Sequence, residues 1–183
     1  TLAKLEQKMR NHFHLVTQNI DGLHLRAGST MEKCHQIHGS INHMRCSLEC
    51  TDDLFTLPDE CERIYEKEDF ESVRDLLICP YCNSMSRPHV LWFDECYNEI
   101  HYRADSAIKA AQASDLLIIA GTTLMTNLPS TIMNAFLSCY KPIISIDIDF
   151  GNSAVAAEKS FGGGFIEGKS AEILPLIAEQ LIG

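Results

Sequence analysis

The stretch Asp115-Leu116-Leu117-Ile118-Ile119-Ala120-Gly121 decides the fold class of this chain. Its continuous apolar run has the length of a strand, and the glycine ends that run. A strand without polar alternation is typically buried on both faces, as in a parallel sheet that helices cover on both sides. The stretch therefore predicts an α/β protein.

The flanking segments alternate between helix and strand. Residues 104–113 predict a helix before this strand, and Pro129 is placed to open a second helix after it. The next apolar, β-branched run, 143–148, predicts a second strand. Two buried strands joined by a helix form a right-handed βαβ unit, whose ligands bind beyond the carboxyl ends of the strands. A last helix is expected from Ser170, which is interpreted as its N-terminal cap.

The loops after these strands carry candidate nucleotide contacts. Gly121, Thr122 and Thr123 can offer backbone amides to a phosphate, and Asp147 can accept hydrogen bonds from a ribose diol. Each has an alternative, because glycine and threonine are common in turns and an acid at a strand end can cap the next element. The run Gly162-Gly163-Gly164 lacks the strand and helix of a dinucleotide loop, so it predicts a flexible turn.

A second polar site is expected near the front of the chain. The apolar run 13–16 predicts a strand, and Gln18, Asn19 and Asp21 follow it closely. Each polar group that is buried without a partner costs a few kcal/mol, so these side chains imply a partner for their hydrogen bonds. The strand therefore predicts a binding site at its carboxyl end.

His38 is a candidate general base. Histidine titrates near neutral pH, and the glycine that follows it allows a backbone or a ligand to come close. A single histidine is more often a satisfied core or surface group, so the residue alone leaves both interpretations open.

Four cysteines in two close pairs predict a zinc ribbon: Cys46 with Cys50, and Cys79 with Cys82. Two disulfides or four unrelated thiols are the alternatives, but a chain without a secretory segment favours a reducing compartment. Four protein ligands fill a tetrahedral site, so the ion is expected to be structural. The remaining cysteines are interpreted as reduced thiols: Cys34, Cys61, Cys96 and Cys139.

Length and charge limit the classes of function. A chain of 183 residues can bury one core plus a small module, and no run is long enough to span a bilayer. The net charge of -10 argues against direct nucleic-acid binding. Residues 51–75 hold ten acidic and three basic residues, so seven of the ten net charges lie there. Such a segment is usually a solvated helix face, with a basic peptide as the alternative partner. A cytoplasmic, reducing location is expected.

These features, in this order, resemble the sirtuin family across nearly the whole chain. The motifs are Thr17-Gln-Asn-Ile-Asp-Gly-Leu-His24, Arg26-Ala-Gly-Ser29, His38-Gly39-Ser40, the two cysteine pairs, Arg87-Pro-His-Val-Leu-Trp-Phe93, Gly121-Thr-Thr-Leu124 and Gly168-Lys-Ser170. The resemblance implies a Rossmann-like large domain over 1–40 and 90–183, with a zinc-ribbon small domain inserted over 41–89. It also implies that acyl groups are removed from protein lysine while NAD is consumed.

The resemblance also implies roles for the residues of the first site. Gln18 and Asn19 would orient the nicotinamide ribose and a water, and Ile20 and Asp21 would line the nicotinamide pocket. The acyl oxygen would attack the ribose carbon as nicotinamide leaves. His38 would then take a proton from the ribose hydroxyls, so that the 2′-oxygen attacks the amidate intermediate.

The rest of the cofactor and the acylated substrate would lie along later segments. By the same resemblance, the phosphate, ribose and adenosine contacts would be Gly121, Thr122, Thr123, Asp147, Lys169 and Ser170. The segment from Val90 through Asp94 to Glu95 would pair with the substrate peptide as an added strand, with Leu91 and Phe93 beside the acyl-lysine tunnel.

The chain departs from the family pattern in three places. Asp94 stands where the family usually has glycine, which puts a charge beside the expected peptide backbone, and Asp147 stands where asparagine is common. The chain begins in a helix predicted by Leu2, Leu5 and Met9, without the Gly-Ala-Gly loop or the Pro-x-Phe-Arg segment. We expect the natural protein to carry these upstream, and the 183-residue piece to bind NAD poorly. Two other classes remain open: a mono-ADP-ribosyltransferase, and a non-catalytic zinc-stabilised interaction module.

Overall fold

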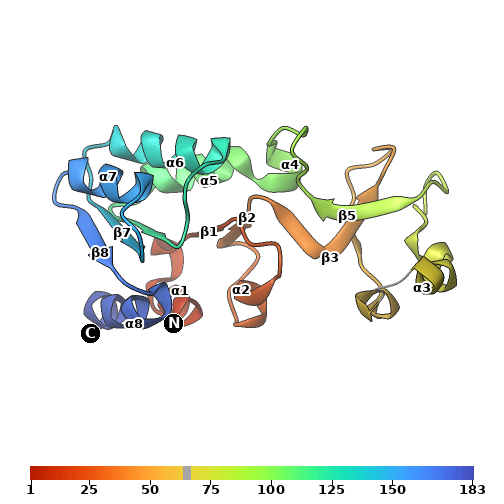
Figure 1. The fold of residues 1–183 in the computed structure, drawn as a ribbon, viewed down its shortest axis with the longest axis horizontal. Helices are drawn as coiled ribbons and strands as arrows, with labels where there is room; N and C mark the ends of the chain where they lie inside the picture. The colour runs from red at the N-terminus through yellow and green to blue at the C-terminus, as the bar shows by residue number, and fades with distance from the viewer. Residues whose placement is uncertain (64–66) are drawn as a thin grey trace.

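The computed structural model describes residues 1–63 and 67–183, which form an elongated molecule with two different ends (Figure 1). Parallel strands and most of the helices lie at one end, and a small antiparallel sheet lies at the other. This arrangement confirms the predicted α/β class with a second, smaller module.

Three parallel strands form the larger sheet, in the order β6-β7-β8. They are β6 (Leu117–Ala120), β7 (Ile143–Asp147) and β8 (Gly164–Glu167). Within the predicted βαβ unit, Leu117 of β6 pairs with Ile143 of β7. Ile143 is fully buried, as expected for a strand that is covered on both faces.

The glycine run before β8 differs from the prediction. The sequence predicts a flexible turn over 162–164, but Gly164 begins β8, and a Cβ on Gly163 would lie 2.2 Å from the carbonyl oxygen of Ile143. Gly163 therefore packs closely against the start of β7, where a larger residue does not fit. Periodicity misses β8 because the strand is short and its last two residues are exposed.

Helices cover the larger sheet. In Figure 1, α5, α6 and α7 lie on one side of it, and α1 and α8 lie on the other. Their bounds are α1 (Leu2–Met9), α5 (Ala104–Ala113), α6 (Asn127–Leu137), α7 (Asn152–Lys159) and α8 (Ser170–Ile182). The helix predicted over 104–113 is confirmed, and α6 begins two residues before Pro129. A buried cluster that includes Phe136 and Ile143 joins α6 and α7 to the sheet.

The predicted cap of the last helix is wrong. Ser170 is the first residue of α8, Lys169 occupies the cap position, and no side chain caps this helix. The chain enters α8 through Gly168 at φ +150, and Lys169 then has an extended backbone. The helix therefore begins one residue earlier than a cap at Ser170 would place it.

A second pair of parallel strands lies next to the helices. β1 (Leu15–Thr17) pairs with β2 (Cys34–Gln36), and α2 (Leu23–Arg26) lies between them in the chain. The sequence predicts this strand over 13–16, but a 3₁₀ turn, η1 (Arg10–His12), comes directly before Phe13, and the strand begins only at Leu15.

The antiparallel module is built on β3 (Gly39–Cys46), which pairs with β4 (Phe55–Thr56) and β5 (Ser86–Val90). Short helices connect β4 to β5: η2 (Asp59–Arg63), α3 (Lys67–Val73) and η3 (Arg74–Leu77). The acidic segment 51–75 runs through them, partly outside the described residues. α4 (Glu99–Tyr102) follows β5. The domain limits at 41 and 89 fall inside β3 and β5 and stay a prediction.

Within the described ranges, no helix combines the length and the apolar character that a bilayer crossing requires.

Candidate functional site

Side chains join the two parallel sheets at their carboxyl ends. Gln18, directly after β1, donates a hydrogen bond from Nε2 to Oγ1 of Thr122, in the loop after β6, over 2.7 Å. Oγ1 of Thr126 donates to Oε1 of Gln18 over 3.3 Å. The carboxyl ends of parallel strands are where such folds bind ligands. The polar side chain of Gln18 therefore has hydrogen-bond partners in and directly after the loop that follows β6.

The residues after Gln18 form a turn that leads into α2. Oδ1 of Asp21 accepts a hydrogen bond from the backbone N–H of Leu23 over 2.9 Å, so this carboxylate holds the turn. The backbone oxygen of Ile20 accepts from the N–H of Ile41 over 2.9 Å, which ties the turn to β3. The side chain of Asn19 is exposed beside this turn.

His38 lies between β2 and β3 and is half-buried. Its Nδ1 atom is 3.1 Å from the backbone oxygen of Gln18. Because a carbonyl oxygen only accepts, Nδ1 carries the proton of the neutral ring and Nε2 keeps its lone pair. Burial lowers the pKa of His38 below its ordinary value of 6.5, while the bond to the Gln18 carbonyl acts in the opposite direction. His38 is therefore neutral at pH 7, and Nε2 is its basic atom.

Gly39 brings this base against β5. It has φ +86, and a Cβ there would lie 2.1 Å from the carbonyl oxygen of His89. The backbone N–H of Leu91 donates to the backbone oxygen of His38 over 3.0 Å. The glycine after His38 therefore allows the backbone of β5 to come close, as the sequence predicts for this position.

Sequence reasoning missed Tyr97. Its hydroxyl oxygen lies 2.8 Å from Nε2 of His38, and the two ring centroids are 5.9 Å apart. Burial raises the pKa of Tyr97 above its ordinary value of 10.0. The phenol is therefore protonated at neutral pH, and its O–H donates a hydrogen bond to Nε2. The two residues are 59 positions apart, and no motif or periodicity connects them in the sequence.

The residues expected around the distal part of a nucleotide lie in the loops after β6, β7 and β8. Gly121 has φ +60, and a Cβ on it would come within 3.7 Å of Oγ of Ser170. The backbone N–H of Gly168 donates to the backbone oxygen of Asp147 over 2.8 Å. Oδ1 of Asp147 accepts from the N–H of Ile148 over 2.8 Å, a contact within the loop and not a cap of α7, which begins at Asn152. These loops therefore form one edge, as the βαβ topology requires.

Two expected cofactor residues are exposed on this edge. The side chain of Thr123 faces solvent, and Lys169, at the cap position of α8, forms an ion pair of 3.8 Å with Glu172 of that helix.

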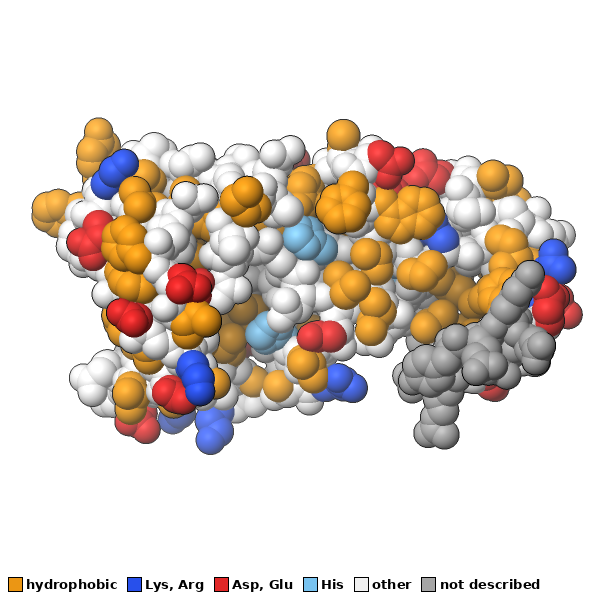
Figure 2. All heavy atoms as spheres, in the orientation of Figure 1, with side chains coloured by type: hydrophobic (Ala, Val, Ile, Leu, Met, Phe, Trp, Pro, Cys, Tyr) orange, Lys and Arg blue, Asp and Glu red, His pale blue; other side chains and the backbone are white. Residues whose placement is uncertain are grey.

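The segment expected to hold a peptide begins beside His38. Leu91 is partly buried, whereas Trp92, Phe93 and Asp94 are exposed. The guanidinium of Arg87 lies over the Trp92 ring, 4.2 Å from its centroid. Figure 2 shows that hydrophobic and histidine side chains adjoin near the middle of this face, between the two ends of the molecule.

Glu95 holds this segment in place. Its Oε1 accepts from the guanidinium groups of Arg45 and Arg87, and its Oε2 accepts from the backbone N–H of Trp92 over 2.8 Å. Arg45 is buried, so its charge needs this partner. The side chain of Glu95 is thus committed to the protein itself.

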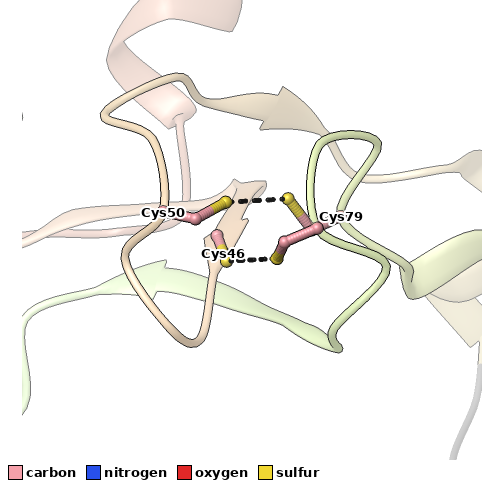
Figure 3. Close-up of side chains that lie close together, drawn as sticks. Cys46, Cys50 and Cys79 are labelled. Carbon is pink, nitrogen blue, oxygen red and sulfur yellow. Dashed lines mark hydrogen bonds between the residues drawn. The ribbon is translucent and has the colours of Figure 1, made fainter.

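Four sulfur atoms form a candidate metal centre in the antiparallel module (Figure 3). All four lie within 4.8 Å of one another, from Cys46, Cys50, Cys79 and Cys82. The Sγ atoms of Cys46 and Cys82 are 3.5 Å apart, and those of Cys50 and Cys79 are 3.6 Å apart. Ligands at about 2.3 Å from a tetrahedral zinc ion lie roughly 3.8 Å from one another. The cluster therefore fits one zinc ion with four thiolate ligands.

Neighbouring groups favour thiolates at two of these positions. A hydrogen bond from Ser84 is the main cause that lowers the pKa of Cys46 to about 6, and Ser84 lowers the pKa of Cys82 as well. Hydrogen bonding to Cys82 raises the pKa of Cys50. All eight cysteines of the chain are free thiols, so the disulfide alternative is not the arrangement in this structure.

The first part of the chain matches a known protein family. A model of the Sir2 family matches residues 1–127. The chain belongs to the Sir2 family.

Its relatives within the family are distant in sequence. An NAD-dependent protein deacylase of Leptospira interrogans (serogroup Icterohaemorrhagiae serovar Lai) is 28% identical over 189 residues, covering 99% of this chain and 65% of the relative. An NAD-dependent protein deacylase of Thermococcus sibiricus is 31% identical over 182 residues, covering 94% of this chain and 62% of the relative. The chain thus spans a little less than two thirds of the length of these relatives.

Solved Sir2 structures have the same fold. A Sir2–p53 peptide–NAD+ complex superposes with a TM-score of 0.73 at 21% identity, over 98% of this chain and 69% of that one. Sir2Af2 bound to a myristoylated histone peptide gives a TM-score of 0.68 at 25% identity, over 92% of this chain and 64% of that one. The likeness supports a Rossmann-like sheet with an inserted zinc-binding module.

In this Sir2-family chain, the expected site residues form three groups, of which one is the strand-end edge with Gly121, Asp147, Lys169 and Ser170. In another group, the side chain of Gln18 donates to Thr122, and the backbone oxygen of Gln18 accepts from Nδ1 of His38. The backbone oxygen of His38 in turn accepts from the N–H of Leu91. The cysteines form a separate group at the far end of β3.

Proposed function

We propose that the protein to which this chain belongs is an NAD-dependent protein lysine deacylase. Its products would be nicotinamide, O-acyl-ADP-ribose and the deacylated lysine. The observation that carries this proposal is His38, a half-buried neutral imidazole whose Nδ1 is held by Gln18, at the edge where the two parallel sheets meet. Relatives over 91–99% of the chain carry the name NAD-dependent protein deacylase.

His38 serves this reaction as a base. As nicotinamide leaves, the acyl oxygen bonds to the ribose carbon, and the alkylamidate forms. Nε2 of His38 then accepts a proton from a ribose hydroxyl, so that the 2′-oxygen attacks the amidate carbon. A neutral imidazole at pH 7 can accept this proton, and a protonated one cannot.

NAD is the proposed co-substrate, with Gln18, Asn19, Ile20 and Asp21 around its nicotinamide ribose. Gly121, Thr122, Thr123, Asp147, Lys169 and Ser170 would contact its phosphates, second ribose and adenine. The second carboxylate oxygen of Asp147 has no hydrogen-bond partner in the described part of the chain, so it can accept from a ribose hydroxyl.

The acyl-lysine peptide is the proposed second substrate. Val90, Leu91, Phe93 and Asp94 would contact it, since this segment begins beside His38 and is largely exposed. Glu95 would contribute to peptide binding indirectly, because its carboxylate binds the backbone N–H of Trp92 and so holds the segment in place. A peptide added as a strand explains tolerance of varied substrate sequences.

One zinc ion, held by the four cysteines, would have a structural role, because no coordination position is left open. We infer that the protein works in a reducing, cytoplasmic compartment, where the four clustered cysteines keep the reduced form that zinc binding requires. Direct contact with nucleic acid or with a membrane is not part of this proposal.

Mass spectrometry tests the proposal. The full-length protein is incubated with NAD and a panel of acyl-lysine peptides, and the expected products are nicotinamide and O-acyl-ADP-ribose in equal amounts. Transfer of ADP-ribose to protein without O-acyl-ADP-ribose would instead indicate a mono-ADP-ribosyltransferase. A lack of both products would favour a non-catalytic interaction module.

A variant assigns the base. His38→Ala should abolish deacylation and leave the zinc content unchanged, since the cysteine cluster lies at the other end of β3. Full turnover by this variant would contradict the role of His38.

A further inference from the structure

The Nε2 atom of His38 already has a hydrogen-bond partner within the protein. The hydroxyl of Tyr97 lies 2.8 Å from it, and the backbone oxygen of Gln18 lies 3.1 Å from Nδ1. Both ring nitrogens are therefore held, one by an acceptor and one by a donor. An imidazole fixed at two opposite atoms cannot rotate about its side-chain torsions without losing a bond.

We propose that Tyr97 is a positioning residue for His38: its hydroxyl donates to Nε2 in the free protein and fixes the imidazole in the orientation in which a ribose hydroxyl, on displacing the phenol, meets the same lone pair. This inference rests on the proposed function, in which Nε2 is the basic atom.

The surroundings of Tyr97 support this role. Its ring packs against a buried cluster that includes Ile37 and Leu128, and its edge meets the ring of Tyr102, with centroids 6.4 Å apart. The phenol is thus fixed by packing on one side and by its bond to Nε2 on the other. A group held in this way can orient its neighbour.

The contact also bears on the protonation of His38. A donor on Nε2 stabilises the neutral ring, since protonation of Nε2 places a second hydrogen between the two atoms and forces the phenol to turn its O–H away. The groups that face His38 are the Gln18 backbone after β1 and Tyr97 before α4, and in the described residues no charged side chain shifts its pKa. Loss of the hydroxyl should therefore raise the pKa of His38.

Tyr97→Phe is the test, because phenylalanine keeps the ring packing and removes only the hydroxyl. The control is Tyr102→Phe: the Tyr102 hydroxyl is buried and has no hydrogen-bond partner within the described part of the chain. Imidazole ¹⁵N NMR of the protein without NAD measures the state of His38, assigned with a His38→Gln variant.

In Tyr97→Phe, the Nε2 resonance should move toward that of an unbonded nitrogen, and the pKa of His38 should rise. The kcat/KM should fall by up to about tenfold, because the imidazole can then turn to orientations in which Nε2 does not face the ribose. The acid limb of kcat/KM should move to higher pH. Tyr102→Phe should leave all four measurements unchanged.

An unchanged Nε2 resonance and titration in Tyr97→Phe would overturn the proposal, whatever the activity. If the resonance and titration respond but the wild-type protein forms no O-acyl-ADP-ribose, the positioning role stands and the proposed function fails. The two results are therefore separable.

Discussion

Gln18 and Thr122 are 104 positions apart in the chain, yet Nε2 of Gln18 lies 2.7 Å from Oγ1 of Thr122. This bond connects the end of β1 to the end of β6, which belong to separate sheets in the described part of the chain. The proposed site thus has a direct bond across the gap between the two sheets.

Thr122→Val tests the contribution of this bond. Valine has nearly the same shape as threonine but cannot accept from Gln18 or from the backbone N–H of Leu124, so the free energy of unfolding should fall by about 1 kcal/mol. Urea denaturation measures the change. Thr123→Val, at an exposed neighbouring position, should alter stability by less than about half of that amount. Equal effects of the two substitutions would mean that the bond contributes nothing specific.

The two carboxylates that meet Arg45 should differ strongly in their contribution. Glu95→Ala leaves the buried guanidinium of Arg45 without its main counter-charge, so it should destabilise the fold by roughly 3 kcal/mol. Glu49 lies 3.6 Å from the same guanidinium but is exposed, and Glu49→Ala should cost less than about 1 kcal/mol. Chemical denaturation of both variants gives the comparison. A Glu95→Ala protein as stable as Glu49→Ala would show that Arg45 finds another partner.

Loss of one cysteine ligand should remove the metal and part of the folding free energy together. Cys79→Ser should lower the zinc content, measured by elemental analysis of the purified protein, and lower the yield of folded protein. Cys61→Ser lies in the same module outside the cluster and should retain about one zinc ion per chain. Full zinc content in Cys79→Ser would contradict a four-cysteine site.

The stability should fall in mild acid because two histidines are buried in neutral form. Burial lowers the pKa of His35 and that of His89 to about 4, from an ordinary value of 6.5. The unfolded chain binds these protons first as the pH falls, so stability is complete above 6.5 and declines toward 4. At pH 5 the loss should be roughly 2 kcal/mol per histidine.

Denaturation curves from pH 7.5 to 4.5 measure this loss. A His35→Gln variant should show a shallower decline than the wild-type protein, because it lacks one of the two groups. Identical slopes for the two proteins would assign the acid sensitivity elsewhere.

The sequence predicts those parts of the molecule that depend on local spacing. The apolar runs of β6 and β7, the helix over 104–113 and the two cysteine pairs carry their own signals, since each is set by residues close together in the chain. The loops at the strand ends follow from the βαβ topology.

The remaining features depend on contacts between distant segments. Tyr97 reaches His38 from 59 positions away, and Glu95 reaches Arg45 from 50 positions away. Neither contact has a periodicity or a spacing that could indicate it. The strand β8 was missed for a related reason: it is an edge strand whose place is fixed by pairing with β7, not by its own composition.

One strand connects the proposed base to the metal centre. β3 begins at Gly39, directly after His38, and its last residue is Cys46. At about 3.3 Å per residue, an eight-residue strand is roughly 25 Å long, so the metal centre lies about one strand length from the base. Gly39 is paired with Val90 at the inner end, and the pairing with β5 is irregular between Ser40 and Met44. A tilt of the outer module would therefore bend at this irregularity and leave the orientation of His38 intact.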